Sequence, residues 1–235
     1  MNEIRAKVTG KVDILIRATQ PEINLQEPLY AVNWFSTKVE WLYHFYNLLA
    51  IRSVKKIGGR AFFKAQVKET ILDDANSKRS LILIVRYPGG ENFKSLMEST
   101  YFKIVSVFRE MSVSKFTFGF THKIESDTNS KLENGLQYAI HHFKFNANVY
   151  DVLEEVKRML PESVSIKYAG NVVATLNSQV KNKPIHQIPN LMDGLFIFQS
   201  AHEEQLRTFF ETGGYKELLK KLESSHISLL KRILV

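Results

Sequence analysis

The chain has 235 residues, of which 44% are hydrophobic and 24% charged, so it can bury a sizeable core and does not resemble a disordered protein. It contains no cysteine, which excludes disulfides, zinc–cysteine sites and thiol chemistry. No apolar run approaches the length of a membrane span, and charges interrupt the first residues where a signal peptide needs its apolar core. We therefore expect a cytoplasmic protein with no membrane partner.

Residues 1–27 stand apart from the rest of the chain. Within them, apolar and polar side chains alternate over residues 7–19. Alternation with a period of two is typical of a strand that is buried on one face. We expect an N-terminal extension that contributes one extra strand.

Residues 28–125 predict the element order β-α-β-β-α-β. A helix with apolar side chains at helical spacing ends at Gly58-Gly59, as expected for glycine after the last helical turn. After Pro88-Gly89-Gly90, a second helix of about 20 residues is expected to end near Met111. The four strands are expected near residues 28–35, 60–68, 80–87 and 115–123.

Residues 126–235 repeat this order. The first predicted strands of the two copies also have similar sequences, since residues 138–143 resemble residues 30–35. Self-similarity that keeps its order along the chain indicates a duplicated domain. Strands are expected near residues 136–145, 164–176, 193–200 and 226–234, and helices near residues 148–160 and 202–222.

The net charge of +8 comes from the first copy. Part of this excess is a basic strip of Arg60, Lys64 and Lys68 on one side of a predicted strand. Its simplest interpretation is the solvated face of an edge strand that lysines protect from edge-to-edge pairing. The alternative is an anion or nucleic-acid patch. Since the second copy has no such strip, we do not expect nucleic acid to be the partner.

The first copy contains the short motifs Ile57-Gly58-Gly59-Arg60, Arg86-Tyr87-Pro88 and Ser99-Thr100-Tyr101, followed by Arg109. In these motifs it resembles the bacterial domains known as domain of unknown function 1330. The resemblance covers residues 28–124, and the second copy is recognised through the first. These domains belong to the dimeric α/β-barrel superfamily of ferredoxin-like folds, which implies two four-stranded sheets packed face to face with helices outside. The acidic residue that the family carries in its third strand is replaced by Arg86, and by Gln199 in the second copy.

Strands at residues 81–85 and 195–198 are apolar on both faces, so one face should be covered by helices and the other by a second sheet. In single-copy relatives the second sheet comes from another subunit, whereas here the duplicate can supply it. We therefore predict an α+β protein. Two ferredoxin-like β-α-β-β-α-β copies would pack their antiparallel four-stranded sheets face to face as an intramolecular pseudo-dimeric α/β barrel. Further assembly into a homo-oligomer stays open.

Candidate ligand-binding residues are polar or aromatic groups at matching positions of the two copies, namely Asn33, Trp34, Arg86, His141 and His142. An asparagine or histidine that points into the barrel could orient a ligand or move a proton. The resemblance implies such uses, since related barrels carry out cofactor-free oxygenation, haem breakdown and isomerisation. Adjacent His141 and His142 should point to opposite faces of their strand, so they cannot chelate one metal as a pair. No catalytic residue, metal site or cofactor is assigned.

Three classes of function remain open. The first is a small-molecule-binding protein or unassigned enzyme, with its pocket inside the barrel or between sheet and helices. The second is a non-catalytic interaction module, and the third is nucleic-acid binding through the basic strip. A cavity lined by Asn33, Arg86 or His141 would favour the first class, while a filled core with an exposed apolar patch would favour the second.

Overall fold

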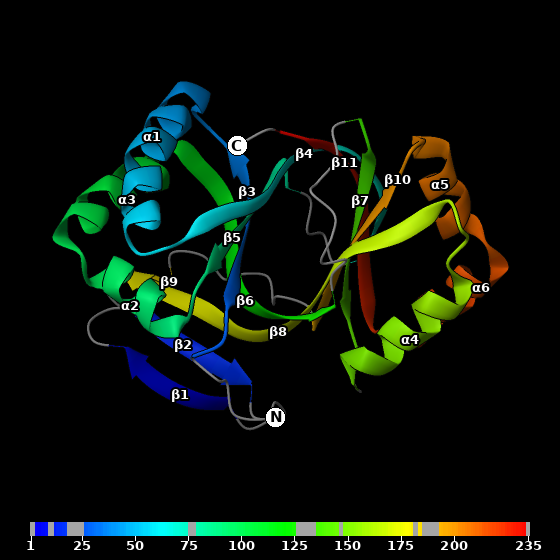
Figure 1. The fold of residues 1–235 in the computed structure, drawn as a ribbon. Helices are drawn as coiled ribbons and strands as arrows, with labels where there is room; N and C mark the ends of the chain where they lie inside the picture. Colours follow the sequence, from blue (N-terminus) through cyan, green and yellow to red (C-terminus); the bar gives the residue numbers. More distant parts are fainter. Residues whose placement is uncertain are drawn as a thin grey trace.

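The computed structural model describes the backbone of residues 3–8, 12–17, 26–74, 79–125, 135–145, 148–180, 183–184 and 193–233. Its centre is a closed barrel of eight antiparallel strands with helices on two opposite sides (Figure 1). Residues from Leu29 to Glu125, called the first half below, supply four of these strands. Residues from Gln137 to Arg232, the second half, supply the other four.

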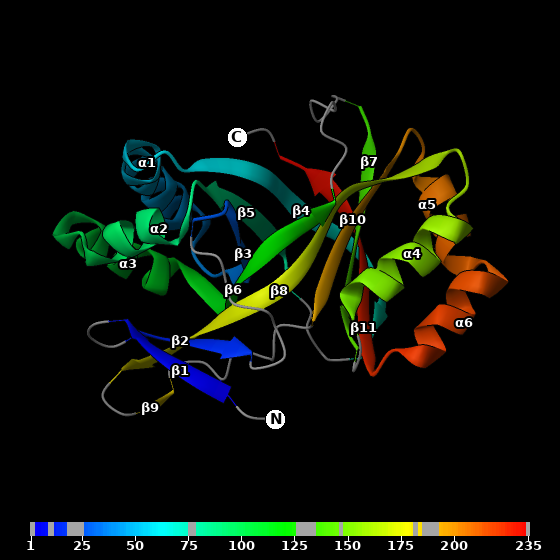
Figure 2. The same cartoon turned by 60° about the horizontal axis from the view of Figure 1, so that its bottom comes forward.

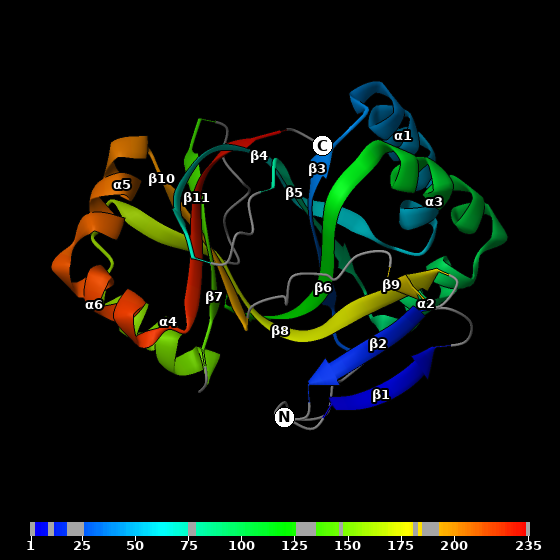
Figure 3. The ribbon, with the colours of Figure 1, turned by 180° about the vertical axis from the view of Figure 1, so that it is seen from behind.

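The first half covers one side of the barrel with three helices (Figures 1 and 3). Its strands are β3 (Leu29–Thr37), β4 (Arg60–Asp73), β5 (Leu81–Tyr87) and β6 (Val113–Glu125). Its helices are α1 (Glu40–Lys56), α2 (Gly90–Glu98) and α3 (Thr100–Ser112). Gly58, just beyond α1, has a φ of 77°, the left-handed conformation in which glycine commonly ends a helix.

The second half has the same sequence of elements on the opposite side of the barrel (Figures 1 and 3). Its barrel strands are β7 (Gln137–Lys144), β8 (Val164–Val180), β10 (Gly194–Ser200) and β11 (Ser224–Arg232), and the short β9 (Lys183–Pro184) pairs with β8. Its helices are α4 (Val149–Met159), α5 (Glu203–Glu211) and α6 (Gly213–Lys221).

The barrel closes through two seams between the halves. The strand order is β8-β10-β7-β11-β4-β5-β3-β6, and β6 pairs back with β8. In both halves the second strand lies beside the third, the third beside the first, and the first beside the fourth. The seams are β11 with β4 and β6 with β8, so the fourth strand of each half joins the second strand of the other.

Apolar side chains fill three layers of the molecule. One lies between the first half's sheet and its helices, and a second lies between the second half's sheet and its helices. The third is the inside of the barrel, to which both halves contribute. The two-sided apolar strands of the sequence therefore have both faces covered, as expected. The fully buried members of the inner layer include Val32, Phe63, Ile82, Ile84, Tyr138, Ile140, Tyr168, Leu195 and Ile197.

Each half was expected to contain a second helix of about 20 residues, and this prediction is wrong. The helix breaks into two at Ser99 in the first half and at Thr212 in the second. Ser99 Oγ accepts a hydrogen bond from the Phe102 backbone N–H (3.4 Å), and Thr212 Oγ1 accepts one from the Tyr215 N–H (3.3 Å). Each hydroxyl residue is thus the N-cap of a new helix, which satisfies an otherwise unpaired donor.

The N-terminal extension contributes two strands rather than the one expected. β1 (Glu3–Val8) pairs with β2 (Val12–Arg17), and β2 pairs with the far end of β8 (Figure 2). This hairpin lies outside the closed barrel. The domain boundaries expected at residues 27 and 125 stay a prediction.

The lysines of β4 suggested an edge strand, but this interpretation is wrong. β4 pairs with β5 on one side and with β11 on the other. Lys64 is half-buried, with its ammonium 5.6 Å from the centroid of the Tyr43 ring. Lys68 forms an ion pair with Glu203 of α5. The basic strip of Arg60, Lys64 and Lys68 is therefore not one free cationic surface.

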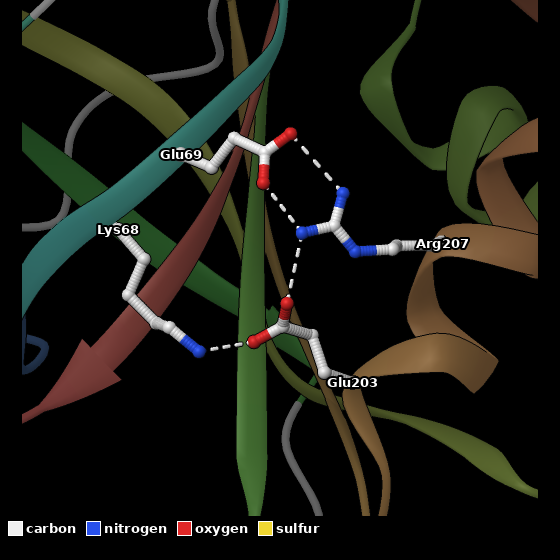
Figure 4. A network of polar contacts seen from close by, with 4 residues as sticks. All are labelled: Lys68, Glu69, Glu203 and Arg207. Atoms are coloured by element: carbon white, nitrogen blue, oxygen red, sulfur yellow. Dashed lines mark hydrogen bonds and ion pairs between the residues drawn. The ribbon is translucent and has the colours of Figure 1, made fainter.

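An ion-pair network joins the halves beside one seam (Figure 4). Arg207 of α5 donates two hydrogen bonds to the carboxylate of Glu69 on β4, at 3.1 and 2.5 Å, and another to Glu203 at 2.8 Å. Lys68 pairs with the other oxygen of Glu203. The hydrogen bond from Arg207 lowers the pKa of Glu69, and those from Lys68 and Arg207 lower the pKa of Glu203. Because these groups are exposed, the network is expected to orient the halves more than to stabilise them.

Among the described residues, no helix combines the length and the apolar character needed to cross a bilayer.

Candidate functional site

Three aromatic rings from three strands meet inside one end of the barrel. The Trp34 ring of β3 lies 5.2 Å from the His142 ring of β7 and 5.2 Å from the His226 ring of β11, measured between centroids. His142 and His226 are direct partners in the pairing of β7 with β11. Alternation along each strand turns these residues inward. Two of the residues singled out from the sequence, Trp34 and His142, are thus brought together.

His226 is the centre of a buried hydrogen-bond relay across the seam between β11 and β4. Its Nδ1 lies 3.0 Å from Asp73 Oδ1, and its Nε2 lies 2.8 Å from Ser228 Oγ. Ser228 in turn lies 3.3 Å from the hydroxyl of Thr70. The side chain of Asp73 is 11% exposed and that of His226 only 1%, so the relay runs from near the surface into the barrel.

Nδ1 of His226 faces the carboxylate of Asp73 and donates to it, which orients the ring. Nε2 forms the second hydrogen bond of the ring, with the hydroxyl of Ser228. Arg79, which is buried nearby, also interacts electrostatically with Asp73.

His142 has a different environment from His226. Burial, and then electrostatic interaction with His226, lowers the pKa of His142 to about 3. The ring is therefore neutral near pH 7 and can offer one donor and one acceptor. Its Nε2 is buried and has no hydrogen-bond partner among the described residues. Leaving such an atom unpaired inside a protein costs about 1–3 kcal/mol, which makes His142 the unusual group of this site.

His141 points away from this site, into the layer between the second half's sheet and its helices. Its Nδ1 lies 2.6 Å from the hydroxyl of Tyr215, and its Nε2 lies 3.1 Å from Ser225 Oγ. Both ring nitrogens are thus partnered, and the ring is fully buried. Burial, and then electrostatic interaction with His142 and His226, lowers the pKa of His141 to about 3. His141 and His142 do lie on opposite faces of β7, as the sequence predicted.

Asn33 and Arg86 are also outside the site. The Asn33 side-chain amide donates to the backbone oxygens of Ala31 and Leu83, both at 3.2 Å, on the helix side of β3. Arg86 is half-buried and lies four residues along β5 from Ile82, the strand partner of Trp34. Asn33 and His141 thus face the helix side of the sheet, while a role of Arg86 in ligand binding stays a prediction.

Sequence reasoning missed the relay. Neither Asp73 nor His226 is among the candidate residues that the sequence indicated. The alternation of His226, Ser228 and Leu230 along β11 was visible, since it puts all three on one face. What the sequence does not show is that β11 pairs with β4, more than 150 residues away, with His226 opposite Asp73.

Within the part of the chain that the structure describes, no group of three or more histidine or acidic side chains is placed to hold a metal ion. His141 and His142 do not act together as ligands, because their rings lie on opposite sides of the sheet.

Comparison with known proteins identifies the fold of this chain but not its chemical activity. No protein-family model and no curated protein matches this chain, so the resemblance to domain of unknown function 1330 stays a prediction. An anthrone oxidase-like protein of solved structure has 10% identity and a TM-score of 0.55, over 88% of this chain and 92% of its own. A putative monooxygenase from Fusobacterium nucleatum subsp. nucleatum has 11% identity and a TM-score of 0.52, over 88% and 93%. Together with the closed eight-stranded barrel, these similarities show that the chain has the dimeric α+β-barrel fold.

Proposed function

We propose that this protein binds a small, flat, uncharged molecule at the barrel end formed by Trp34, His142 and His226. The observation that carries the proposal is the buried, unpartnered Nε2 of His142. Buried polar atoms almost always have a partner, so an unpaired one calls for an explanation. A ligand that supplies the missing hydrogen bond is such an explanation.

The surroundings restrict the chemistry of this ligand. Trp34 and the two imidazole rings offer aromatic surfaces, which favour a planar partner. His142 is neutral, so it suits a hydroxyl or carbonyl group better than an ion. Phenols and aromatic ketones combine these properties, and anthrone, which appears in the name of one structural neighbour, is a practical probe.

The properties of the site support ligand binding better than a catalytic role in which His142 abstracts a proton. A general base works best when its pKa lies near the working pH, whereas the pKa of His142 is about 3. His226 is held between Asp73 and Ser228, which orients its ring but occupies both nitrogens. Oxygen uptake with anthrone is therefore expected to stay at the background rate.

Tryptophan fluorescence gives a direct test, because the chain has only two tryptophans. In a Trp41→Phe variant the remaining Trp34 reports on the barrel end. Anthrone is expected to quench its emission with a saturable dependence on concentration. His142→Phe in the same background should weaken binding about three- to tenfold, the effect of one lost neutral hydrogen bond. His202→Phe, on the exposed residue before α5, is the matched control. No saturable quenching by any phenol or aromatic ketone would contradict the proposal.

We also propose that the halves are ferredoxin-like copies that arose by duplication and now form a pseudo-dimer within one chain. Support comes from their identical strand order and from the helix break that recurs at Ser99 and Thr212. A single-copy relative that builds the same barrel from two subunits would test this origin. A relative whose single copy forms a closed barrel alone would count against it.

A second candidate function is that of an interaction module. It is favoured because a large apolar surface is exposed on α1 and α3. The two functions are compatible, since they use different parts of the molecule.

A further inference from the structure

Helices α1 and α3 expose a continuous apolar surface on the outside of the first half. Exposed fractions reach 70% for Trp41, 68% for Leu48 and 61% for Ile104. The two helices pack side by side, and the rings of Phe45 and Phe108 touch with centroids 5.4 Å apart (Figures 1 and 3). We call this surface the α1–α3 face; its residues are Trp41, Phe45, Leu48, Ile104, Val107 and Met111.

This face is not a requirement of the fold. The second half covers its sheet with α4, α5 and α6, whose described residues expose a single large apolar side chain, Tyr150. A helix with apolar residues all round is normally buried on every side, and α1 is of this kind. Its inner side buries Leu42, Tyr43 and Tyr46, while its outer side carries the exposed apolar residues.

The size of the face suits a protein interface. An aromatic side chain alone carries about 150–250 Å² of surface, so six large apolar residues that are roughly half or more exposed present several hundred Å². The largest apolar patch of a typical soluble monomer is about 300–600 Å², and a stable dimer covers about 800 Å² on each partner. The apolar part of the α1–α3 face is thus comparable to the largest patches of soluble monomers, and its charged flanks would add to the area covered in a dimer.

The charges on the two helices are arranged for contact with a second copy. α1 carries Glu40 in its first turn and Lys55 in its last, and α3 carries Lys103 in its first turn and Glu110 in its last. The start of α1 meets the end of α3, because the backbone N–H of Val39 donates to the carbonyl of Ser112 at 3.2 Å. The helices are therefore antiparallel, with Glu40 and Glu110 at one end of the face and Lys55 and Lys103 at the other.

A two-fold axis that crosses both helices at their middles would pack α1 on α1 and α3 on α3 of the second copy, each antiparallel. Glu40 would then lie opposite Lys55 of the second copy, and Lys103 opposite Glu110. An axis parallel to the helices would instead place like charges together. Lys38 and Arg109 at the acidic end do not cancel this pattern, since Lys38 precedes the helix and Arg109 lies over the Phe116 ring.

We infer that the α1–α3 face is a homodimer interface with this two-fold, antiparallel arrangement of helices. The inference rests on the interaction module named above as the second candidate function, and it is independent of ligand binding in the barrel. The centre of the interface is apolar and its ends are charged, which is the usual anatomy of a specific interface.

Sedimentation velocity over protein concentrations of about 1–100 µM tests the interface. The unmodified chain is expected to shift from monomer to dimer over this range. Leu48→Glu and Ile104→Glu should each raise the dissociation constant at least about tenfold, because each puts a charge at the apolar centre. Tyr150→Glu, on the exposed side of α4, is the matched control and should leave it unchanged. Thermal melts show whether each variant is folded.

Charge reversal tests the arrangement itself. Lys103→Glu alone should weaken the dimer, and Lys103→Glu with Glu110→Lys should restore it, because the two residues face each other across the axis. In a Trp34→Phe variant, Trp41 is the only tryptophan and its emission should shift to shorter wavelength as the dimer forms. A chain that stays monomeric at every concentration overturns the inference. So does a dimer that Leu48→Glu leaves intact, or a monomer that instead cosediments with anionic vesicles.

Discussion

Two adjacent histidines in β7 share a strongly lowered pKa but differ in what surrounds them. His141 has both nitrogens engaged, by Tyr215 and Ser225, whereas Nε2 of His142 has no partner among the described residues. Burial is the main cause of the lowered pKa in both cases. His141 is therefore expected to stabilise the core, and the proposed ligand-binding role of His142 rests on its unpartnered Nε2.

His141→Ala is expected to destabilise the protein by about 1–3 kcal/mol, because it leaves the buried hydroxyls of Tyr215 and Ser225 without their hydrogen-bond partner. A thermal melt beside the unmodified protein measures the loss. His202→Ala, on an exposed residue, should leave the melting temperature almost unchanged. If His141→Ala were as mild as that control, the structural role of His141 would be wrong.

Stability should fall in mild acid because of these two rings. A histidine whose pKa drops from 6.5 in the unfolded chain to about 3 in the folded one contributes stability that is present above pH 6.5 and lost as the pH falls toward 3. Each ring adds a slope of about 1.4 kcal/mol per pH unit within that window.

His142→Phe should therefore reduce the pH dependence of the unfolding free energy in acid by about one proton taken up on unfolding. This change in slope is expected whatever the effect of the substitution at pH 7. Urea unfolding at several pH values between about 4 and 6.5 measures this slope. His44→Phe, on a side chain that is 64% exposed, is the control and should keep the original slope. An unchanged slope for His142→Phe would show that this ring is protonated in the folded state.

The sequence indicated correctly that His141 and His142 face opposite sides of their strand, because alternation along a strand is a local property. It did not indicate which of the two faces into the barrel, and it favoured Asn33 and His141, which lie on the helix side of the sheet. It could not indicate the relay of Asp73, His226 and Ser228, because that depends on which strands meet at the seam between the halves. A barrel closed by non-local strand pairing brings together residues that are far apart in the sequence. The local sequence pattern around each of these residues does not indicate which residue it will contact.

At the scale of elements, the order and approximate bounds of the strands were predictable from apolar alternation and turn residues. The break in the second helix of each half was not recognised, although Ser99 and Thr212 are both good N-cap residues. Apolar spacing continues across each break, so periodicity alone predicts one helix. The prediction that β4 is an edge strand was wrong because its partner β11 is the last strand of the chain. The relay was missed for the same reason, since it also depends on this non-local pairing.

Gly194 at the start of β10 tests how tightly the strands of the second half pack. A Cβ at this position would lie 2.1 Å from Cζ of Phe143, a fully buried ring. Gly194→Ala is therefore expected to cost about 1–3 kcal/mol by overpacking, measured by urea unfolding. Gly213→Ala at the first residue of α6 is the matched control, because nothing lies within 4 Å of its Cβ. It should be neutral or stabilising by about 0.5–1 kcal/mol. Equal effects at the two sites would contradict the packing of β10 against β7.

At the scale of the whole molecule, the inside of the barrel belongs to neither half alone. Ile82 and Ile84 of β5 share one core with Ile140 of β7 and Ile197 of β10, and both seams are antiparallel strand pairings. Opening one half would expose this shared core and leave two long strand edges unpaired. The halves should therefore unfold as one cooperative unit, despite having the element content of two domains.

Native-state hydrogen exchange measures this cooperativity. The slowest amides of β3 and β5 in the first half and of β7 and β10 in the second are expected to open with the same free energy, that of global unfolding. Gly194→Ala perturbs only the second half directly, yet it should lower the protection of β3 and β5 as much as that of β7 and β10. If protection fell in β7 and β10 alone, the halves would be separate folding units that merely touch, and the shared core would contribute little to the stability of either.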